Sequence, residues 1–268
     1  MSKPLFYRQF ACDSYYNMAV DEWLFDRAHS APGLLFVRLY SWAEGAITFG
    51  VNQDMERAFD SSQLNGTPVI RRITGGRALY HDCSELTYSI AVNLSGWRGR
   101  EWATGRSSFY GAVAEALAEF VTVMGKDAGY CRRSAESNSH SDFFHKAACF
   151  ASVSRYEVLA ESGKIVASAA RQMGDTIVQH GSIKLDGVAY HPALYYPVVD
   201  GLSHSVGLQP LSGPRWELAS DIFPNVLSRH LGIDLRRGEF DLRESAELDS
   251  RAKLVCGTAL RQRILLNS

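Results

Sequence analysis

The sequence lacks the features that mark membrane, secreted and general nucleic-acid-binding proteins. None of its 268 residues belongs to a run of about 18 apolar residues, so we expect no membrane-spanning helix. The first ten residues hold no apolar stretch typical of a signal peptide. Lys and Arg number 28 against 29 Asp and Glu, so the chain has no basic excess for binding nucleic acid. We therefore expect a cytoplasmic protein with neither a nucleic-acid nor a membrane partner.

Cysteine is scarce, and its spacing excludes two kinds of site. The chain has 5 cysteines, an odd number, and no C-x-x-C pair occurs. They are Cys12, Cys83, Cys131, Cys149 and Cys256. This pattern supports neither a disulfide framework nor a zinc site, so we predict free thiols and no metal. Hydrophobic residues make up 46% and charged residues 21%, which is typical of a folded chain and excludes general disorder.

Several motifs of common enzyme classes are also absent. The sequence has no G-x-x-x-x-G-K-[ST], G-x-G-x-x-G, H-E-x-x-H or G-x-S-x-G segment. These absences argue against P-loop hydrolases, simple dinucleotide enzymes, zinc proteases and α/β-hydrolases.

Hydrophobic periodicity and turn residues predict a mixture of helices and strands. The expected helices cover residues 16–28, 54–64, 102–124, 216–231 and 243–266. The expected strands cover residues 34–40, 46–49, 68–72, 78–80, 86–92, 155–160, 164–170 and 176–185. Hairpins and mixed strands flanked by helices favour an α+β fold with a mixed or largely antiparallel sheet. No repeat or linker is visible, so we expect a single domain over residues 1–268.

A glycine pair flanked by arginines is the first candidate site. The segment is Arg-Arg-Ile-Thr-Gly-Gly-Arg-Ala-Leu-Tyr-His-Asp, and it contains Arg72, Gly75, Gly76 and His81. Adjacent glycines let the backbone approach a ligand closely, and arginines can bind a phosphate or a carboxylate. An ordinary glycine hairpin with solvated arginines fits the same residues.

Two further segments carry polar groups among small residues. Lys164 follows a turn glycine and precedes the small residues Ala167, Ser168 and Ala169, which leave space for a narrow ligand. His180 lies in a Gln-His-Gly-Ser-Ile segment, where a hydrogen-bonded structural histidine is the more common case. For Lys164 too, the more common case is a solvated lysine at the edge of a sheet.

Cys149 lies in an apolar Ala-Ala-Cys-Phe segment after a polar stretch at residues 134–142, which we expect to form a loop. Cysteine in such surroundings is usually a small buried hydrophobic residue. A nearby ammonium group would instead favour the thiolate and make the sulfur a nucleophile.

Taken in order, these motifs resemble the biotin/lipoate A/B protein ligase family. The resemblance also includes Asn-Met-Ala-Val-Asp-Glu at residues 17–22 and Ile-Thr-Phe-Gly at residues 47–50, and it extends over about residues 14–240. It implies that family's catalytic fold, a mixed sheet surrounded by helices, with a catalytic core at approximately 30–240.

Within that family, the Cys-Phe-x-Ser segment is most similar to single-domain octanoyltransferases. The resemblance implies that Cys149 takes an octanoyl group from octanoyl-acyl carrier protein as a thioester. A lysine on a lipoyl domain of a 2-oxoacid dehydrogenase, or on the glycine-cleavage H protein, then receives it as an amide. Lys164 would lower the pKa of the thiol and contact the acyl carbonyl. No cofactor is implied, because a thioester already carries enough free energy for amide formation.

The other candidate residues would bind the acyl chain. By resemblance, Gly75, Gly76, Ala167, Ser168 and Ala169 line an acyl tunnel. The resemblance also implies positioning roles for Arg72 and His81, and His180 is a further substrate-binding candidate. The family usually has glycine where this chain has Ala167, so the preferred chain length is open.

Three other functions fit the same motifs. An ATP-dependent lipoate-protein ligase would use arginines for its nucleotide, but common ligases carry a further domain for which residues after about 240 leave little room. An amidotransferase would move octanoyl or lipoyl groups between carrier domains. A non-catalytic module that binds acylated proteins would keep the tunnel without the chemistry.

Overall fold

The structure, a computed structural model, describes residues 3–131, 155–161, 163–186, 188–189, 191–194, 204–205 and 209–266. Its helices are α1 (Ser14–Ser30), α2 (Met55–Ala58), α3 (Arg106–Val123), α5 (Gly213–Leu231) and α6 (Leu242–Leu266). Its strands are β1 (Leu5–Cys12), β2 (Leu35–Trp42), β3 (Ala46–Phe49), β4 (Val69–Arg71), β5 (Leu79–His81), β6 (Leu86–Asn93), β7 (Ala128–Tyr130), β8 (Val158–Ala160), β9 (Gly163–Met173), β10 (Thr176–Ile183), β11 (Val188–Ala189), β12 (His204–Ser205) and β13 (Arg236–Arg237). No helix in this part of the chain is both long enough and apolar enough to cross a membrane.

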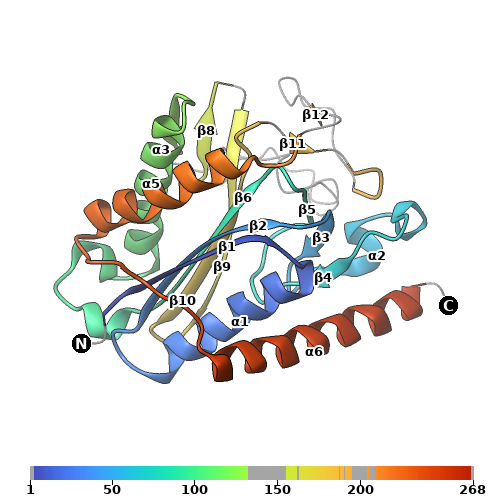
Figure 1. Cartoon of the computed structure of the whole chain (residues 1–268), viewed down its shortest axis with the longest axis horizontal. Coiled ribbons are helices and arrows are strands. Elements are labelled where there is room, and N and C mark those ends of the chain that lie inside the picture. The colour runs from blue at the N-terminus through green and yellow to red at the C-terminus, as the bar shows by residue number, and fades with distance from the viewer. Residues whose placement is uncertain are drawn as a thin grey trace.

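A large mixed sheet forms the centre of the molecule (Figure 1). Its strand order is β13-β1-β2-β6-β10-β9-β8-β7, in which β1 pairs in parallel with β13 and β2 while the remaining pairs are antiparallel. A smaller sheet of order β4-β3-β5 lies beside it, and β11 pairs with β12. The α+β class and the mixed sheet predicted from the sequence are confirmed.

The two faces of the large sheet are covered by different helix pairs (Figure 1). Helices α3 and α5 pack on one face, and α1 and α6 pack on the other. Successive residues of a strand point to opposite faces. On β10, Ile177 therefore joins the cluster under α3 and α5, whereas Val178 joins the cluster under α1.

The small sheet is joined to the large one by a compact group of side chains. Met18 of α1, Tyr40 and Trp42 of β2, Ala46 and Ile70 pack together at the junction of the two sheets. On its other side the small sheet packs against α2 and Phe59. The two sheets thus meet beside the first turns of α1, and the space between them holds the candidate site.

Most predicted elements are present, with boundaries shifted by a few residues. Helix α1 begins earlier than expected because the Asp13 carboxylate accepts hydrogen bonds from the backbone N–H groups of Tyr15 and Tyr16. The helix expected over residues 54–64 was wrong in length. It ends at Ala58 because Phe59 turns inward to pair with Leu194, and a 3-10 turn at Ser61–Gln63 follows.

Strand β1 was missed by the sequence analysis. Arg8 and Gln9 are adjacent polar residues in its middle, and the register shifts between Gln9 and Cys12, so the strand shows no clean alternation. Its parallel neighbours β2 and β13 are distant in sequence, and local patterns contain no information on such pairing.

Candidate functional site

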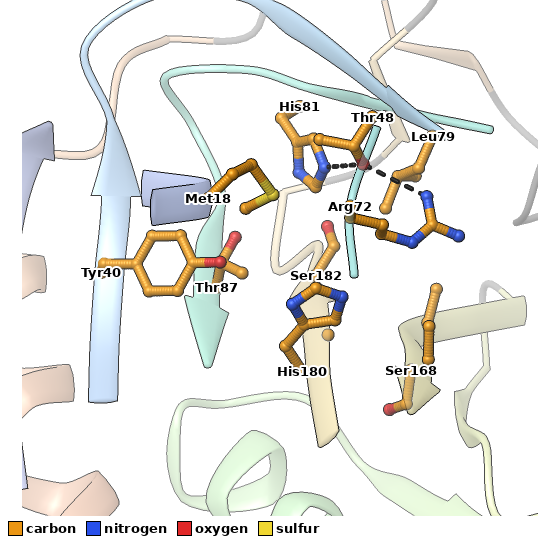
Figure 2. A pocket seen from close by; sticks show the side chains of 13 residues that line it. Met18, Tyr40, Thr48, Arg72, Leu79, His81, Thr87, Ser168, His180 and Ser182 are labelled. Carbon is orange, nitrogen blue, oxygen red and sulfur yellow. Dashed lines mark hydrogen bonds between the residues drawn. The ribbon is translucent and has the colours of Figure 1, made fainter. Parts of the chain in front are cut away.

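A small cavity of about 20 Å³ lies between strands β9 and β10 of the large sheet, helix α1 and the small sheet (Figure 2). This volume is enough for about one water molecule. The 13 residues around it are Met18, Tyr40, Thr48, Arg72, Leu79, His81, Thr87, Ala167, Ser168, Ala169, His180, Gly181 and Ser182. They come from α1, β2, β3, β5, β6, β9 and β10 and from the residue after β4, so the fold unites segments that lie far apart in the sequence.

Six of the predicted site residues line this cavity: Arg72, His81, Ala167, Ser168, Ala169 and His180. The alternation of β9 explains part of this arrangement. Ala167 is paired with Ser182, and Ala169 with His180, so these four residues share the sheet face that is turned toward the small sheet.

The glycine pair supports the cavity wall instead of lining it. The Gly75 carbonyl accepts hydrogen bonds from Arg72 Nε at 3.1 Å and from Nη2 at 2.6 Å. Gly76 has φ +85°, and a Cβ atom there would lie 2.8 Å from Arg72 Nη2 and 3.5 Å from the Ala169 Cβ. Glycine is therefore needed at position 76 for both its backbone conformation and its close packing.

One hydrogen-bonded chain on the cavity wall runs from Asp21 through His180 to Thr74. His180 Nδ1 lies 2.8 Å from Asp21 Oδ2, and its Nε2 lies 2.6 Å from Thr74 Oγ1. Burial alone would raise the pKa of the Asp21 carboxyl, but the hydrogen bond from His180 and the charge of Arg38 hold that pKa below its ordinary value. An ionised carboxylate only accepts, so His180 donates to Asp21 from Nδ1.

A second chain of the same kind runs from Glu85 through His81 to Thr48. His81 Nδ1 lies 2.7 Å from Glu85 Oε1, and its Nε2 lies 2.8 Å from Thr48 Oγ1. Burial favours the neutral carboxyl, but Lys184 and His81 together lower the pKa of Glu85 to about 2. Burial also lowers the pKa of His81, despite the neighbouring Glu85. The neutral imidazole therefore donates to Glu85 and accepts from Thr48.

Arg72 connects the two chains. Its Nη1 donates to Thr48 Oγ1 at 3.3 Å and its Nε to Thr74 Oγ1 at 3.2 Å, and Figure 2 shows the Thr48 hydroxyl between Arg72 and His81. Each threonine thus bonds a histidine and accepts from Arg72. The guanidinium, both hydroxyls and both imidazoles are held in one fixed arrangement, so the polar atoms of this wall bond mainly to one another.

Ser182 is the exception among the cavity residues. Its side chain is fully buried, and its Oγ atom has no hydrogen-bond partner within the described part of the chain. A buried hydroxyl without a partner is energetically unfavourable.

Lys164 is buried next to Glu157 and is absent from the cavity lining. Its Nζ atom donates to Glu157 Oε1 at 2.6 Å, and the two side chains are 2% and 8% exposed. The pairing of β9 with β8 shifts register between Lys164 and Val166, so the alternation that places Ala167 and Ala169 does not extend to Lys164. Cys149 lies outside the described residues. The pairing of Lys164 with Cys149 therefore stays a prediction.

Sequence reasoning missed the residues that orient the predicted ones. Asp21, Thr48, Thr74 and Glu85 are buried, and each bonds a predicted histidine. Asp21 had a usable signal, because a carboxylate on the apolar face of a helix needs a buried partner. Among the described residues, no group of three or more His, Cys, Asp or Glu side chains is placed to hold a metal ion.

Comparison with known proteins agrees with the motifs and with the architecture. Residues 13–197 match the family model for the lipoyl protein ligase A/B catalytic domain. The chain is 34% identical to Octanoyltransferase LipM of Kyrpidia tusciae over 251 residues, which cover 87% of this chain and 89% of that protein. It is 33% identical to Octanoyltransferase LipM of Geobacillus kaustophilus over 178 residues, which cover 65% of this chain and 63% of that protein.

Solved structures share the fold at low sequence identity. Lipoate-protein ligase A bound with ATP superposes with a TM-score of 0.66 at 18% identity, and the match covers 94% of each chain. A bipartite lipoate protein ligase from Thermoplasma acidophilum gives a TM-score of 0.60 at 18% identity, covering 93% of this chain and 92% of that one. Because family motifs, relatives and fold agree, the chain belongs to the lipoyl protein ligase A/B catalytic domain family.

Proposed function

We propose that this protein is an octanoyltransferase that moves an octanoyl group from acyl carrier protein to a lysine of a carrier domain. The acceptor is a lipoyl domain of a 2-oxoacid dehydrogenase or the glycine-cleavage H protein. Relatives at 31–34% identity are octanoyltransferases by name.

The observation that carries this proposal is the convergence of the family motifs on one narrow cavity. The cavity lies between two sheets, and small residues of β9 form one of its walls. Methylene groups gain about 0.8 kcal/mol each on burial, so a narrow slot selects a hydrocarbon chain by its length. Met18 and Leu79 are the flexible apolar side chains in the lining, and their movement would open the slot for an acyl chain.

The proposed reaction has two steps with Cys149 as the nucleophile. Its thiolate attacks the thioester carbonyl of the donor, the carbon–sulfur bond to the carrier breaks, and the carrier thiolate leaves. The neutral ε-amine of the acceptor lysine then attacks the new acyl-cysteine thioester. The amide bond forms, the Cys149 thiolate leaves, and the amine nitrogen loses a proton.

Lys164 supports the first step as a buried cation. Its ammonium group favours thiolate over thiol at a nearby cysteine and is a hydrogen-bond donor for the carbonyl oxygen. The ion pair with Glu157 stabilises the charged amine in a buried position. Glu157 therefore acts on the chemistry through Lys164 as a positioning residue.

The decisive experiment follows the mass of the intact protein after incubation with octanoyl-acyl carrier protein in the absence of ATP. We expect one octanoyl adduct that hydroxylamine removes and that Cys149→Ala abolishes. Cys131→Ala is the matched control, because Cys131 is a partly exposed cysteine outside the family motifs and its replacement should leave the adduct intact. Addition of an apo lipoyl domain should then transfer the octanoyl group to that domain.

The other outcomes identify the competing functions. No adduct, together with ATP-dependent attachment of free lipoate to the lipoyl domain, would establish the ligase. Transfer from octanoylated H protein alone would establish the amidotransferase. Binding of octanoyl-acyl carrier protein without any transfer would leave only a binding module.

A further inference from the structure

A groove of about 570 Å³ runs along helix α6 on the outer side of the Arg72 region. Helix α6 contributes Arg251 and Leu254, β4 contributes Arg71, and β9 contributes Arg171. Among the described residues that line it, four are arginines and one, Glu22, is acidic. Arg71 and Arg72 belong to the glycine–arginine motif, but the proposed chemistry assigns no role to this groove.

Two of these arginines, Arg71 and Arg171, have guanidinium groups with unused donors. Arg71 Nη1 donates to the carbonyls of Val51 and Gln53 at 2.8 and 3.1 Å, and its guanidinium lies 4.4 Å from the centre of the Phe49 ring. Arg171 stacks over Phe25 at 5.4 Å. Within the described part of the chain, the Arg171 side chain makes neither a hydrogen bond nor an ion pair. Such groups can donate to an anion without first losing a protein partner.

The other two arginines are already occupied by protein groups. Arg251 pairs with Asp26 at 2.7 Å and with Glu247 at 3.1 Å, and Arg72 donates to the Gly75 and Arg77 carbonyls. Partial burial and the neighbouring Asp26 raise the pKa of Glu22, whereas Arg251 and Arg171 lower it. The groove keeps a net positive charge, concentrated at Arg71 and Arg171.

The groove also presents apolar surface and adjoins the acyl cavity. Leu254 is 69% exposed and Val51 is 40% exposed, so both present aliphatic surface to solvent. Arg72 lines both the groove and the cavity, so its side chain forms a common wall. A ligand that reaches the cavity from this side would therefore pass between a guanidinium pair and an aliphatic patch.

We propose that this groove binds the prosthetic arm of the thioester donor, with Arg71 and Arg171 on its phosphodiester and Leu254 and Val51 on the hydrocarbon next to it. The proposal rests on the proposed function and specifies how that site receives its donor. The 4′-phosphopantetheine arm of an acyl carrier protein has a phosphate followed by a geminal dimethyl group, in agreement with this order of charge and apolar surface. Guanidinium groups match phosphate oxygens with paired hydrogen bonds. The acceptor lysine has no phosphate, so the observations favour the donor.

The test compares two small thioesters that differ only in the phosphate: S-octanoyl-4′-phosphopantetheine and S-octanoyl-pantetheine. The readout is kcat/KM for octanoylation of an apo lipoyl domain by the full chain. We expect wild-type protein to favour the phosphorylated donor by roughly ten- to a hundredfold, the range for one or two charged hydrogen bonds. Arg171→Gln and Arg71→Gln should each reduce this ratio toward one.

Arg229→Gln is the matched control, because Arg229 is an exposed arginine on α5 at the opposite face, and its replacement should leave the ratio unchanged. A wild-type ratio near one, with transfer from both thioesters, would overturn the groove proposal and preserve the octanoyltransferase. An unchanged ratio in Arg171→Gln, with a higher KM for the lipoyl domain, would assign the groove to the acceptor and also overturn the proposal. Failure of both thioesters, with ATP-dependent use of free lipoate, would overturn the proposed function itself.

Discussion

The two faces of the large sheet use the same strands, but they bury different kinds of side chain. Toward α3 and α5, strands β2 and β6 present Val37, Leu39 and Ile90 to a large apolar cluster. Toward α1, β2 presents Arg38, which is fully buried and bonded to Asp21. Apolar packing gains stability directly, whereas buried charges are tolerated only when each has a partner. On the α1 face, paired polar side chains held in a fixed arrangement therefore take the place of purely apolar packing.

The largest effect should come from removing one partner of the buried charges. Arg38→Met leaves Asp21 without its main cation, and loss of one member of a buried pair costs about 3–5 kcal/mol. Ile90→Val, on the opposite face, should cost only about 0.5–1.5 kcal/mol because it deletes one methylene. Urea unfolding gives both free energies. Equal losses of unfolding free energy in the two variants would mean that the buried charges of the α1 face are no more sensitive to substitution than the apolar side chains of the opposite face.

Acid should weaken the α1 face selectively. The pKa of Glu85 is about 2 in the folded protein against 4.5 for the free side chain. A lowered pKa gives stability that is present above the unfolded-state pKa and is lost as the pH falls through the folded one. Between about pH 5 and pH 2, the free energy of unfolding should thus fall by about 3 kcal/mol from this group alone.

Unfolding of Glu85→Gln over the same pH range tests this assignment. The free energy of unfolding of this variant should change less with pH than that of the wild type. Its stability at pH 7 should also be lower, because Lys184 loses its ion pair with Glu85. Glu217→Gln is the control, because that carboxylate is 58% exposed and should leave the slope nearly unchanged. An identical slope in Glu85→Gln would refute the proposed contribution of Glu85.

How far the sequence predicts this molecule depends on the range of each interaction. Strand β3 was predicted with its observed bounds because alternation and a following glycine are local signals. The motif residues of the cavity were also found, since each motif is short and continuous. Local patterns show which segments are chemically unusual.

The contacts that orient those residues were not predictable in the same way. His180 and Asp21 are 159 residues apart, and nothing near either one specifies the other. The Lys164–Glu157 pair is closer in sequence, but the shifted register between β8 and β9 decides which side chain reaches the lysine. The basic groove depends on how α6 lies against β4, which no local pattern contains.

Two buried hydroxyls on the polar face, those of Ser182 and Thr87, differ in whether they have hydrogen-bond partners. Ser182→Ala should stabilise the free protein by about 1 kcal/mol, because it removes a buried group that has no hydrogen bond. Thr87→Val is the matched variant in the same cavity. Its hydroxyl accepts from Trp42 Nε1 at 2.9 Å and donates to Glu85 at 2.7 Å, so its loss should destabilise the protein. Thermal unfolding gives the sign of each change, and destabilisation by Ser182→Ala would indicate a partner for Ser182.

The smallest expected effect concerns a single methyl group on the wall of the cavity. Ala167 lies in the lining, whereas Ala170, on the same strand, points to the other face. Both Ala→Gly changes loosen β9 equally, but only Ala167→Gly widens the slot. We expect it to raise kcat/KM for decanoyl relative to octanoyl donors by about fourfold, equal to ~0.8 kcal/mol for one methylene. Competition between the two donors measures this ratio directly. The same shift in Ala170→Gly would trace the length preference to strand flexibility, and no shift in either variant would remove Ala167 from the determinants of chain length.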